Sequence, residues 1–166
     1  MKMIVTGHAG HGKDTVCDYI KSMSMLTSIS SSWFMCQLLI FDRLKGKYGY
    51  TDPEDCYHDR HNHRSEWFDI IRDYNQPDRT RLGRALLANY DIYNGIRCRD
   101  EYLALCDFDD IDFTLWVDAS KRLPDEPSTS MTMTAELADY VINNNGSLAE
   151  LEAELHNLIT MLLATY

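Results

Sequence analysis

Apolar residues in this chain follow two patterns, short continuous runs and longer segments with helical spacing. The run at residues 2–6 leads into a glycine-rich loop, and the segment after the loop, residues 13–26, places Val16, Ile20 and Met23 on one side of a helix. The pattern therefore predicts that the chain begins as strand, loop and helix.

The same two patterns predict most of the remaining elements. Helical spacing recurs at residues 64–75, 78–89, 99–106, 135–139 and 147–163. Short runs rich in aromatic and β-branched residues predict strands at residues 90–95, 112–118 and 140–142. Polar, turn-forming residues predict loops at residues 46–63 and 121–134. The segment 28–44 fits a buried strand or the start of a helix, and its periodicity does not distinguish them.

The last predicted helix carries a clean apolar stripe behind a candidate N-cap, Ser147. The stripe consists of Leu148, Leu151, Leu155, Leu158 and Leu162. Packing against a sheet explains such a stripe, and it would also suit a homodimer. Its two heptads are too few to establish a coiled coil.

Strands that alternate with helices predict a three-layer α/β/α fold with a central, mostly parallel sheet, formed as one domain by residues 1–166. In sheets of this kind the ligand binds at the carboxyl ends of the strands. The glycine-rich loop falls at such an end, so we expect the main site there.

Composition and charge narrow the function classes. A formal net charge of −10 argues against broad contact with nucleic acid or an anionic membrane surface, because such binding needs a basic face. No apolar run approaches the roughly 18 residues of a membrane span, and the chain opens without the pattern of a signal peptide. The five cysteines are an odd number without C-x-x-C spacing. We expect reduced thiols and a cytoplasmic location.

The arginines are concentrated in one part of the chain. Eight of the ten lie within residues 60–99 beside five acids, which makes this span +3 (8 minus 5) and the remainder −13. Such a concentration is typical of a local anion site, because guanidinium groups bind phosphate oxygens in pairs. Solvated helix faces are the alternative, which we favour for four of them: Arg72, Arg79, Arg81 and Arg84.

The stretch GHAGHGKDT has the spacing of a phosphate-binding loop. The glycines allow successive backbone N–H groups to turn toward phosphate oxygens, and the helix that follows adds its positive dipole end. Lys13 supplies a mobile charge for the outer phosphates. The predicted nucleotide-binding residues are Gly7, His8, Ala9, Gly10, His11, Gly12, Lys13, Asp14 and Thr15. We expect the two histidines to offer only their backbone N–H groups and to keep their side chains free for adenine or solvent.

Asp14 stands where the usual loop has Ser or Thr to bind Mg²⁺. Two interpretations are open. Asp14 and Thr15 can hold Mg²⁺ directly or through water, because a carboxylate is a good hard ligand. Alternatively, Asp14 only favours the helix N-terminus by its charge, a contribution of about 0.3 to 1 kcal/mol.

Five segments together resemble the deoxynucleoside monophosphate kinases of tailed bacteriophages. They are GKDT, YHDRHNHRSEWFDIIRDYN, DIYNGIRCRDEY, LWVDASKRLPDE and ADYVINNNGSLAEL. The resemblance is weakest at residues 25–44. It implies a P-loop kinase fold with an acceptor-binding segment near residues 46–76 and a short lid near 119–133. It also implies transfer of the γ-phosphoryl of ATP to a deoxynucleoside monophosphate, with Mg²⁺, in the cytoplasm of the host cell.

The resemblance also implies roles for the basic residues. Lys13 and the loop amides would hold ATP, and Arg64, together with Arg60, would bind the phosphate of the acceptor. Arg97 would point into the same cleft, and Arg122 of the lid would close over the transferring group. This chemistry depends on positioning and charge neutralisation, which agrees with the absence of a Ser/His/Asp signature.

Related chains often carry an acid before the GIR segment, where this chain has Asn94. Asp14, Asp91 or Asp118 would then compensate, or the acid is dispensable. Solvation of strand ends is the alternative role of Asp91 and Asp118.

Aromatic and metal-ligating residues allow further interpretations. Trp67 lies one turn after Arg64 and would either stack on the acceptor base or pack in the core; Trp33 and Trp116 are assigned to the core. The spacing of Cys56, His58, His61 and His63 matches no structural zinc pattern. Two rivals remain, a P-loop kinase for a ribonucleotide or metabolite and a nucleotide-binding protein without turnover.

Overall fold

A five-stranded parallel sheet forms the centre of the molecule. The computed structural model describes residues 1–108 and 111–165, and over these residues the strands lie in the order β2-β3-β1-β4-β5. The strands are β1 (Met3–Thr6), β2 (Ser28–Ser30), β3 (Ile92–Asn94), β4 (Phe113–Asp118) and β5 (Tyr140–Asn143). All four strand pairings are parallel, which confirms the predicted sheet type and places all carboxyl ends at one edge.

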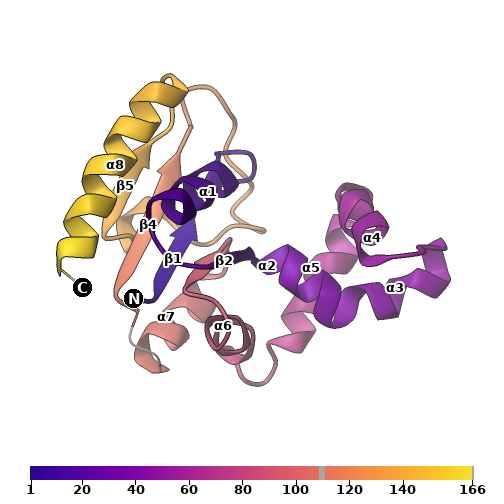
Figure 1. Ribbon diagram of the computed structural model, residues 1–166. Helices are drawn as coiled ribbons and strands as arrows, with labels where there is room; N and C mark the ends of the chain where they lie inside the picture. The colour runs from indigo at the N-terminus through magenta and orange to yellow at the C-terminus, as the bar shows by residue number, and fades with distance from the viewer. Residues whose placement is uncertain (109–110, 166) are drawn as a thin grey trace.

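Helices cover both faces of this sheet (Figure 1). On one face α1 (Lys13–Met23) and α8 (Leu148–Thr165) enclose a core with the alternate strand residues, among them Val5 and Leu115. On the other face the remaining helices enclose a second core around Tyr93. Because both faces of the strands are buried, the central strands read as continuous apolar runs. The predicted three-layer α/β/α arrangement around a central parallel sheet is confirmed.

The second face is built by a chain of short helices. They are α2 (Ser31–Met35), the π-helical turn η1 (Cys36–Ile40), α3 (Phe41–Tyr48), α4 (Pro53–Asp59), the 3₁₀ turn η2 (Arg60–Asn62), α5 (Arg64–Tyr74), α6 (Arg81–Leu87) and α7 (Arg99–Phe108). A last 3₁₀ turn, η3 (Ala135–Leu137), precedes β5. Figure 1 shows that α3, α4 and α5 extend beyond the edge strand β2. We call residues 31–74 the helical arm.

The structure decides one open interpretation and corrects one prediction in residues 28–63. The ambiguous segment 28–44 contains both candidates, a strand followed directly by helices. The loop expected at 46–63 is wrong, because α4 and η2 occupy most of it. Its helix signal is an Asp–Pro pair: the Asp52 carboxylate accepts the backbone N–H of Asp55 (2.9 Å), and Pro53 fits the first helical turn.

The terminal helix forms as predicted. Ser147 Oγ accepts the N–H of Glu150 (3.3 Å), and the Glu150 carboxylate accepts the N–H of Ser147 (2.7 Å), a reciprocal capping box. Four leucines of the stripe are buried together with Ile159, whereas Leu148 is 57% exposed. Among the described residues, no helix has the length and apolar character to cross a membrane.

A buried acidic residue of α7 contacts β3. Glu101 on α7 accepts a hydrogen bond from the Tyr93 hydroxyl (2.7 Å), and only 7% of the residue is exposed. Burial raises the pKa of Glu101 to about 7, although the hydrogen bonds from Tyr93 and Asn75 favour its charged form.

Glu101→Gln should reduce the loss of stability at high pH. Folding raises the pKa of Glu101 from 4.5, so its stabilising contribution is complete below that value and is lost as pH rises through 7. Gln keeps an acceptor for Tyr93 without the charge. Denaturant unfolding from about pH 5 to pH 8.5 should show the free energy of unfolding of the variant gaining about 2 kcal/mol over wild type. A constant difference would mean that Glu101 titrates normally.

Candidate functional site

The glycine-rich loop, residues 7–12, joins β1 to α1 at the carboxyl edge of the sheet. Gly12 ends it with φ +97°, and a Cβ there would collide with the side-chain amide of Asn144. Gly7 has φ +142°, and a Cβ there would lie 2.5 Å from the Val117 carbonyl oxygen. Two of the glycines are therefore required by backbone conformation and by close neighbours.

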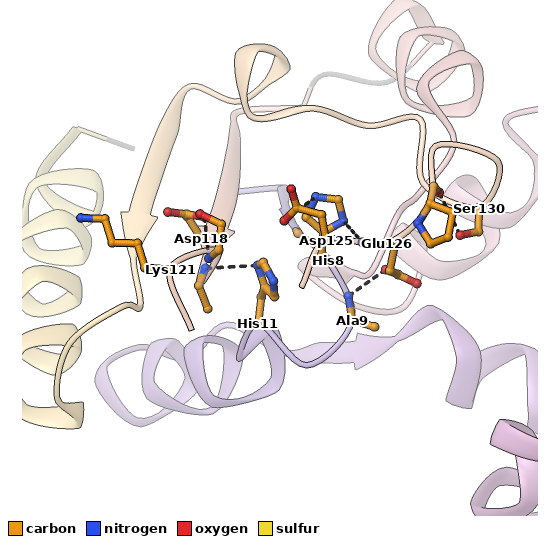
Figure 2. Close-up of polar contacts among 12 residues, drawn as sticks. His8, Ala9, His11, Asp118, Lys121, Asp125, Glu126 and Ser130 are labelled. Carbon is orange, nitrogen blue, oxygen red and sulfur yellow. Dashed lines mark hydrogen bonds and ion pairs between the residues drawn. The ribbon is translucent and has the colours of Figure 1, made fainter. Parts of the chain in front are cut away.

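Residues at the ends of β4 and β5 hold this loop in place. The side-chain amide of Asn144 donates to the His11 carbonyl (2.8 Å), and the backbone N–H of Ala119 donates to His11 Nδ1 (3.1 Å). Figure 2 shows the His11 ring pointing toward the end of β4. His11 is fully buried, so its ring is part of the fold.

The His8 side chain also forms contacts within the protein. Its Nδ1 accepts the backbone N–H of Glu126 (3.0 Å), and its ring lies edge-on to Trp116 with 5.3 Å between the centroids. The expectation that His8 and His11 keep free side chains is therefore wrong. In both residues a ring nitrogen accepts a backbone N–H from the segment after β4, which ties the glycine-rich loop to that segment.

Lys13 folds back over the loop. Its Nζ donates to the carbonyl oxygens of Gly7 (2.9 Å) and His8 (2.8 Å). Burial, followed by the positive charge of Arg97, lowers the pKa of Lys13 to about 8, while nearby acids oppose the shift. An anion that entered beside Lys13 and Arg97 would relieve their repulsion.

Asp14 contacts the residue that stands in place of the expected acid. The side-chain amide of Asn94 donates to Asp14 Oδ1 (2.6 Å), and Asn94 is only 4% exposed. The side-chain oxygen of Asn94, Oδ1, is buried and has no hydrogen-bond partner. The negative charge at this point thus comes from α1 instead of β3, and two oxygen-bearing side chains lie side by side. Such a donor set fits Mg²⁺, with Thr15 exposed on the next position of the helix.

The other acids named as substitutes lie in hydrogen-bonded turns. Asp91 accepts the backbone N–H and the hydroxyl of Thr27, both at 2.7 Å, beside the start of β3. Asp118 accepts the backbone N–H of Ser120 (3.1 Å) and the side-chain amide of Asn145 (2.9 Å) at the end of β4. Asp14 is the acid in direct contact with Asn94.

A hollow of about 390 Å³ opens beside Asp14, between α1 and α4. Its walls come from five elements, α1, β2, α2, α4 and β3, and include Ser30, Trp33, Glu54, Tyr57, His58 and Asn94. The rings of Trp33 and Tyr57 meet edge to face with 5.1 Å between centroids. The volume is within the range of small-ligand sites. Trp33, assigned to the core from sequence, is half-buried and lines this hollow.

The arginines of the arm lie outside the walls of the hollow. Arg60 stacks on the Tyr57 ring, 3.8 Å from its centroid, and donates to the Tyr57 carbonyl (2.7 Å). Arg64 is exposed and contacts His61 Nδ1 (3.2 Å). Trp67 is 4% exposed and belongs to the core, so the structure agrees with its core interpretation and does not bring it to the hollow.

Arg97 and Arg122 each contact a residue that binds the glycine-rich loop. Arg97 follows β3 and forms an ion pair with Glu126. Arg122 donates from Nε to the carbonyl of Asn144 (2.7 Å), the residue that anchors the loop. The chain that follows β4, residues 119–134, includes Arg122 and forms no helix or strand, which confirms the loop predicted at 121–134; we call residues 119–134 the covering loop.

Several of these residues escaped the sequence analysis. Asn144 lies within the ADYVINNNGSL segment, and Glu126 lies between two prolines in PDEP. Neither sequence pattern predicts which residue the side chain contacts. The five cysteines have free thiols. Within residues 1–108 and 111–165, no three His, Cys, Asp or Glu side chains are grouped as metal ligands.

Comparison with known proteins yields similarity in structure alone. Neither a family model nor a curated sequence matches the chain. Among solved structures, TT1252 from Thermus thermophilus is similar with a TM-score of 0.50 and 16% identity, over 98% of this chain and 97% of that one. A gluconokinase from Sinorhizobium meliloti 1021 has a TM-score of 0.49 and 16% identity, over 99% and 96%. At this identity the likeness to TT1252 shows a shared fold.

Asn94→Asp should place two carboxylates in contact and make stability depend on pH and Mg²⁺. The repulsion lowers the melting temperature at about pH 8, and a shared proton at low pH or added Mg²⁺ restores it. Thermal unfolding followed by circular dichroism measures both effects. Asn94→Ala, which removes the donor without adding charge, should show neither rescue. If Asn94→Asp had the same melting temperature as Asn94→Ala at each pH and Mg²⁺ concentration, the result would contradict the cation site.

Proposed function

We propose that this protein is a P-loop kinase that transfers the γ-phosphoryl group of ATP to a deoxynucleoside monophosphate. The observation that carries the proposal is the meeting of a phosphate loop, with Lys13 and Arg97 beside it, and a separate hollow whose wall begins at Asp14. Two adjoining sites are what a transfer between two small molecules requires, because the enzyme must hold donor and acceptor in line.

The donor side is supported by the loop. Its backbone N–H groups, the N-terminus of α1 and Lys13 would bind the phosphates of ATP. Asp14 and Thr15 would hold Mg²⁺, with Asn94 orienting the Asp14 carboxylate. The ion neutralises phosphate charge when bound.

The acceptor side is supported by the hollow. Trp33 and Tyr57 offer aromatic surface for a base, and such stacking contributes about 1 to 3 kcal/mol per base. The acceptor's phosphate would face Arg97 from the sheet edge and Arg64 from the arm. Arg64 reaches it if the arm closes toward α1, a movement common in kinases. Arg122 would approach from the covering loop.

The chemistry needs no general base. The attacking group is already a phosphate oxygen anion, so the chain's residues act by positioning and by neutralising charge. A metabolite alcohol as acceptor would need a base near its hydroxyl. The arginines favour a phosphorylated acceptor, although a ribonucleotide would satisfy them equally well.

An ADP-release assay with ATP and Mg²⁺ against all common deoxynucleoside and ribonucleoside monophosphates tests the proposal. We expect turnover confined to deoxynucleotides. Turnover with ribonucleotides or another acceptor would mean that the proposed acceptor is wrong. Binding of ATP without turnover on any acceptor would favour a nucleotide-binding protein without catalysis.

Lys13→Ala should abolish phosphoryl transfer and leave the fold intact. Among the hydrogen bonds described for it, its Nζ contacts only the backbone carbonyls of Gly7 and His8, so its loss removes charge from the phosphates and little packing. Turnover and circular dichroism check the two halves of the prediction. Lys45→Ala, which removes an exposed lysine on α3, is the control and should keep full activity.

Arg64→Ala and Trp33→Ala should each raise the KM of the acceptor about ten-fold and that of ATP much less, through lost charge-assisted and stacking contacts. Steady-state kinetics with each substrate varied measures this. Arg72→Ala, on the same helix as Arg64 but paired with Asp69 at the surface, should change neither constant. A larger rise for ATP would mean that the two sites are exchanged.

A further inference from the structure

The covering loop inserts a carboxylate into the phosphate loop. Glu126 Oε2 accepts the backbone N–H of Ala9 (2.7 Å), and Glu126 Oε1 pairs with the Arg97 guanidinium. Figure 2 shows the Glu126 carboxylate beside Ala9, joined to its backbone N–H. The side chain is only 10% exposed. We call the Ala9 N–H and the Arg97 guanidinium the phosphate cradle.

These two donors suit a phosphate oxygen as well as a carboxylate. A backbone N–H in a glycine-rich loop and a guanidinium are the groups that bind phosphate most often. A carboxylate is planar and carries one negative charge, so it satisfies the same donors with less charge than a triphosphate. Glu126 and a nucleotide phosphate cannot occupy the cradle together.

The surrounding contacts hold Glu126 in this position. Its own backbone N–H donates to His8 Nδ1 (3.0 Å), and the neighbouring Asp125 lies 3.5 Å from His8 Nε2. Pro124 and Pro127 flank the pair in the sequence, and a residue that precedes proline is restricted to extended backbone. The carboxylate is thus delivered by a stiff segment.

We propose that Glu126 is a built-in competitor of the nucleotide, a carboxylate that must leave the phosphate cradle before a phosphate enters it. The inference rests on the proposed function in that the ligand of the loop is a nucleoside triphosphate. Glu126 lowers the apparent affinity by the fraction of molecules in which it holds the cradle. Binding of the nucleotide therefore releases the middle of the covering loop.

Glu126→Gln is the decisive variant. Gln keeps the shape and an acceptor for Ala9 but loses the charge-assisted pair with Arg97, so the cradle should open more easily. Calorimetric titration of the full chain with ATP and Mg²⁺, and with inorganic tripolyphosphate, should show Kd about ten-fold lower for both. Glu136→Gln removes the same charge at an exposed position of η3, beyond the covering loop, and should change Kd less than about two-fold.

The Ala9 amide gives a readout that does not depend on turnover. In ¹⁵N-labelled protein its resonance should shift in Glu126→Gln and shift again on adding tripolyphosphate, whereas Glu136→Gln should leave it in place. This measurement reports the contact between Glu126 and the loop directly.

The outcomes separate this inference from the proposed function. Equal Kd values in wild type and Glu126→Gln would overturn the competitor and leave the kinase proposal standing. Weaker binding by the variant would also overturn it, because Glu126 would then support the nucleotide-binding conformation. If neither wild type nor variant binds ATP, the proposed function fails and the inference fails with it.

Discussion

The hydrogen bond from the Asn144 side chain to the His11 carbonyl fixes the geometry on which the site depends. It joins the end of β5 to the glycine-rich loop between β1 and α1, across the neighbouring strand β4. Because Asn144 is buried against the loop, Gly12 has no space for a side chain, and α1 can begin only where it does. The direction of α1, and with it the placement of Lys13 and Asp14, follows from this contact. A buried His11 carbonyl without a hydrogen-bond partner would reduce the stability of the fold, and the side-chain amide of Asn144 prevents this by donating to it.

Charge around the loop is arranged across elements instead of within a single motif. Asp14 supplies the acid that β3 lacks, and Asn94 of β3 supplies the hydrogen bond that orients it. On the opposite side Arg97 supplies a cation whose carboxylate partner comes from the covering loop. The acid beside the lysine therefore has a structural partner in an amide. A second carboxylate in that place would repel it without a cation between them.

The sequence predicted the elements whose signals are local. The spacing of Val16 and Ile20, the glycines of the loop and the cap at Ser147 each depend on neighbours within a turn or two, and the corresponding elements formed as expected. Helix α4 was missed because the polar, turn-forming residues of this segment predict a loop, and the capping signal at Asp52 was not given weight. The contacts of His8, His11 and Glu126 join residues more than one hundred positions apart, so no local pattern reveals them. The hollow beside Trp33 forms only where α1, β2 and α4 meet in the folded protein. The sequence around Trp33 therefore does not distinguish this position from one in the core, which is the position predicted for it.

The covering loop is attached to the sheet edge at both of its ends. Arg122 binds the Asn144 carbonyl near the beginning, and the backbone N–H groups of Thr132 and Met133 donate to the Arg97 carbonyl near the end. Met131 and Met133 are buried, which strengthens the second attachment. Most of the entropy of closing this loop is thus already lost in the folded protein. A proteolytic cut between the two attachments would leave each half tied to the sheet, so the fold would survive the cut while the contact of Glu126 with the glycine-rich loop would not.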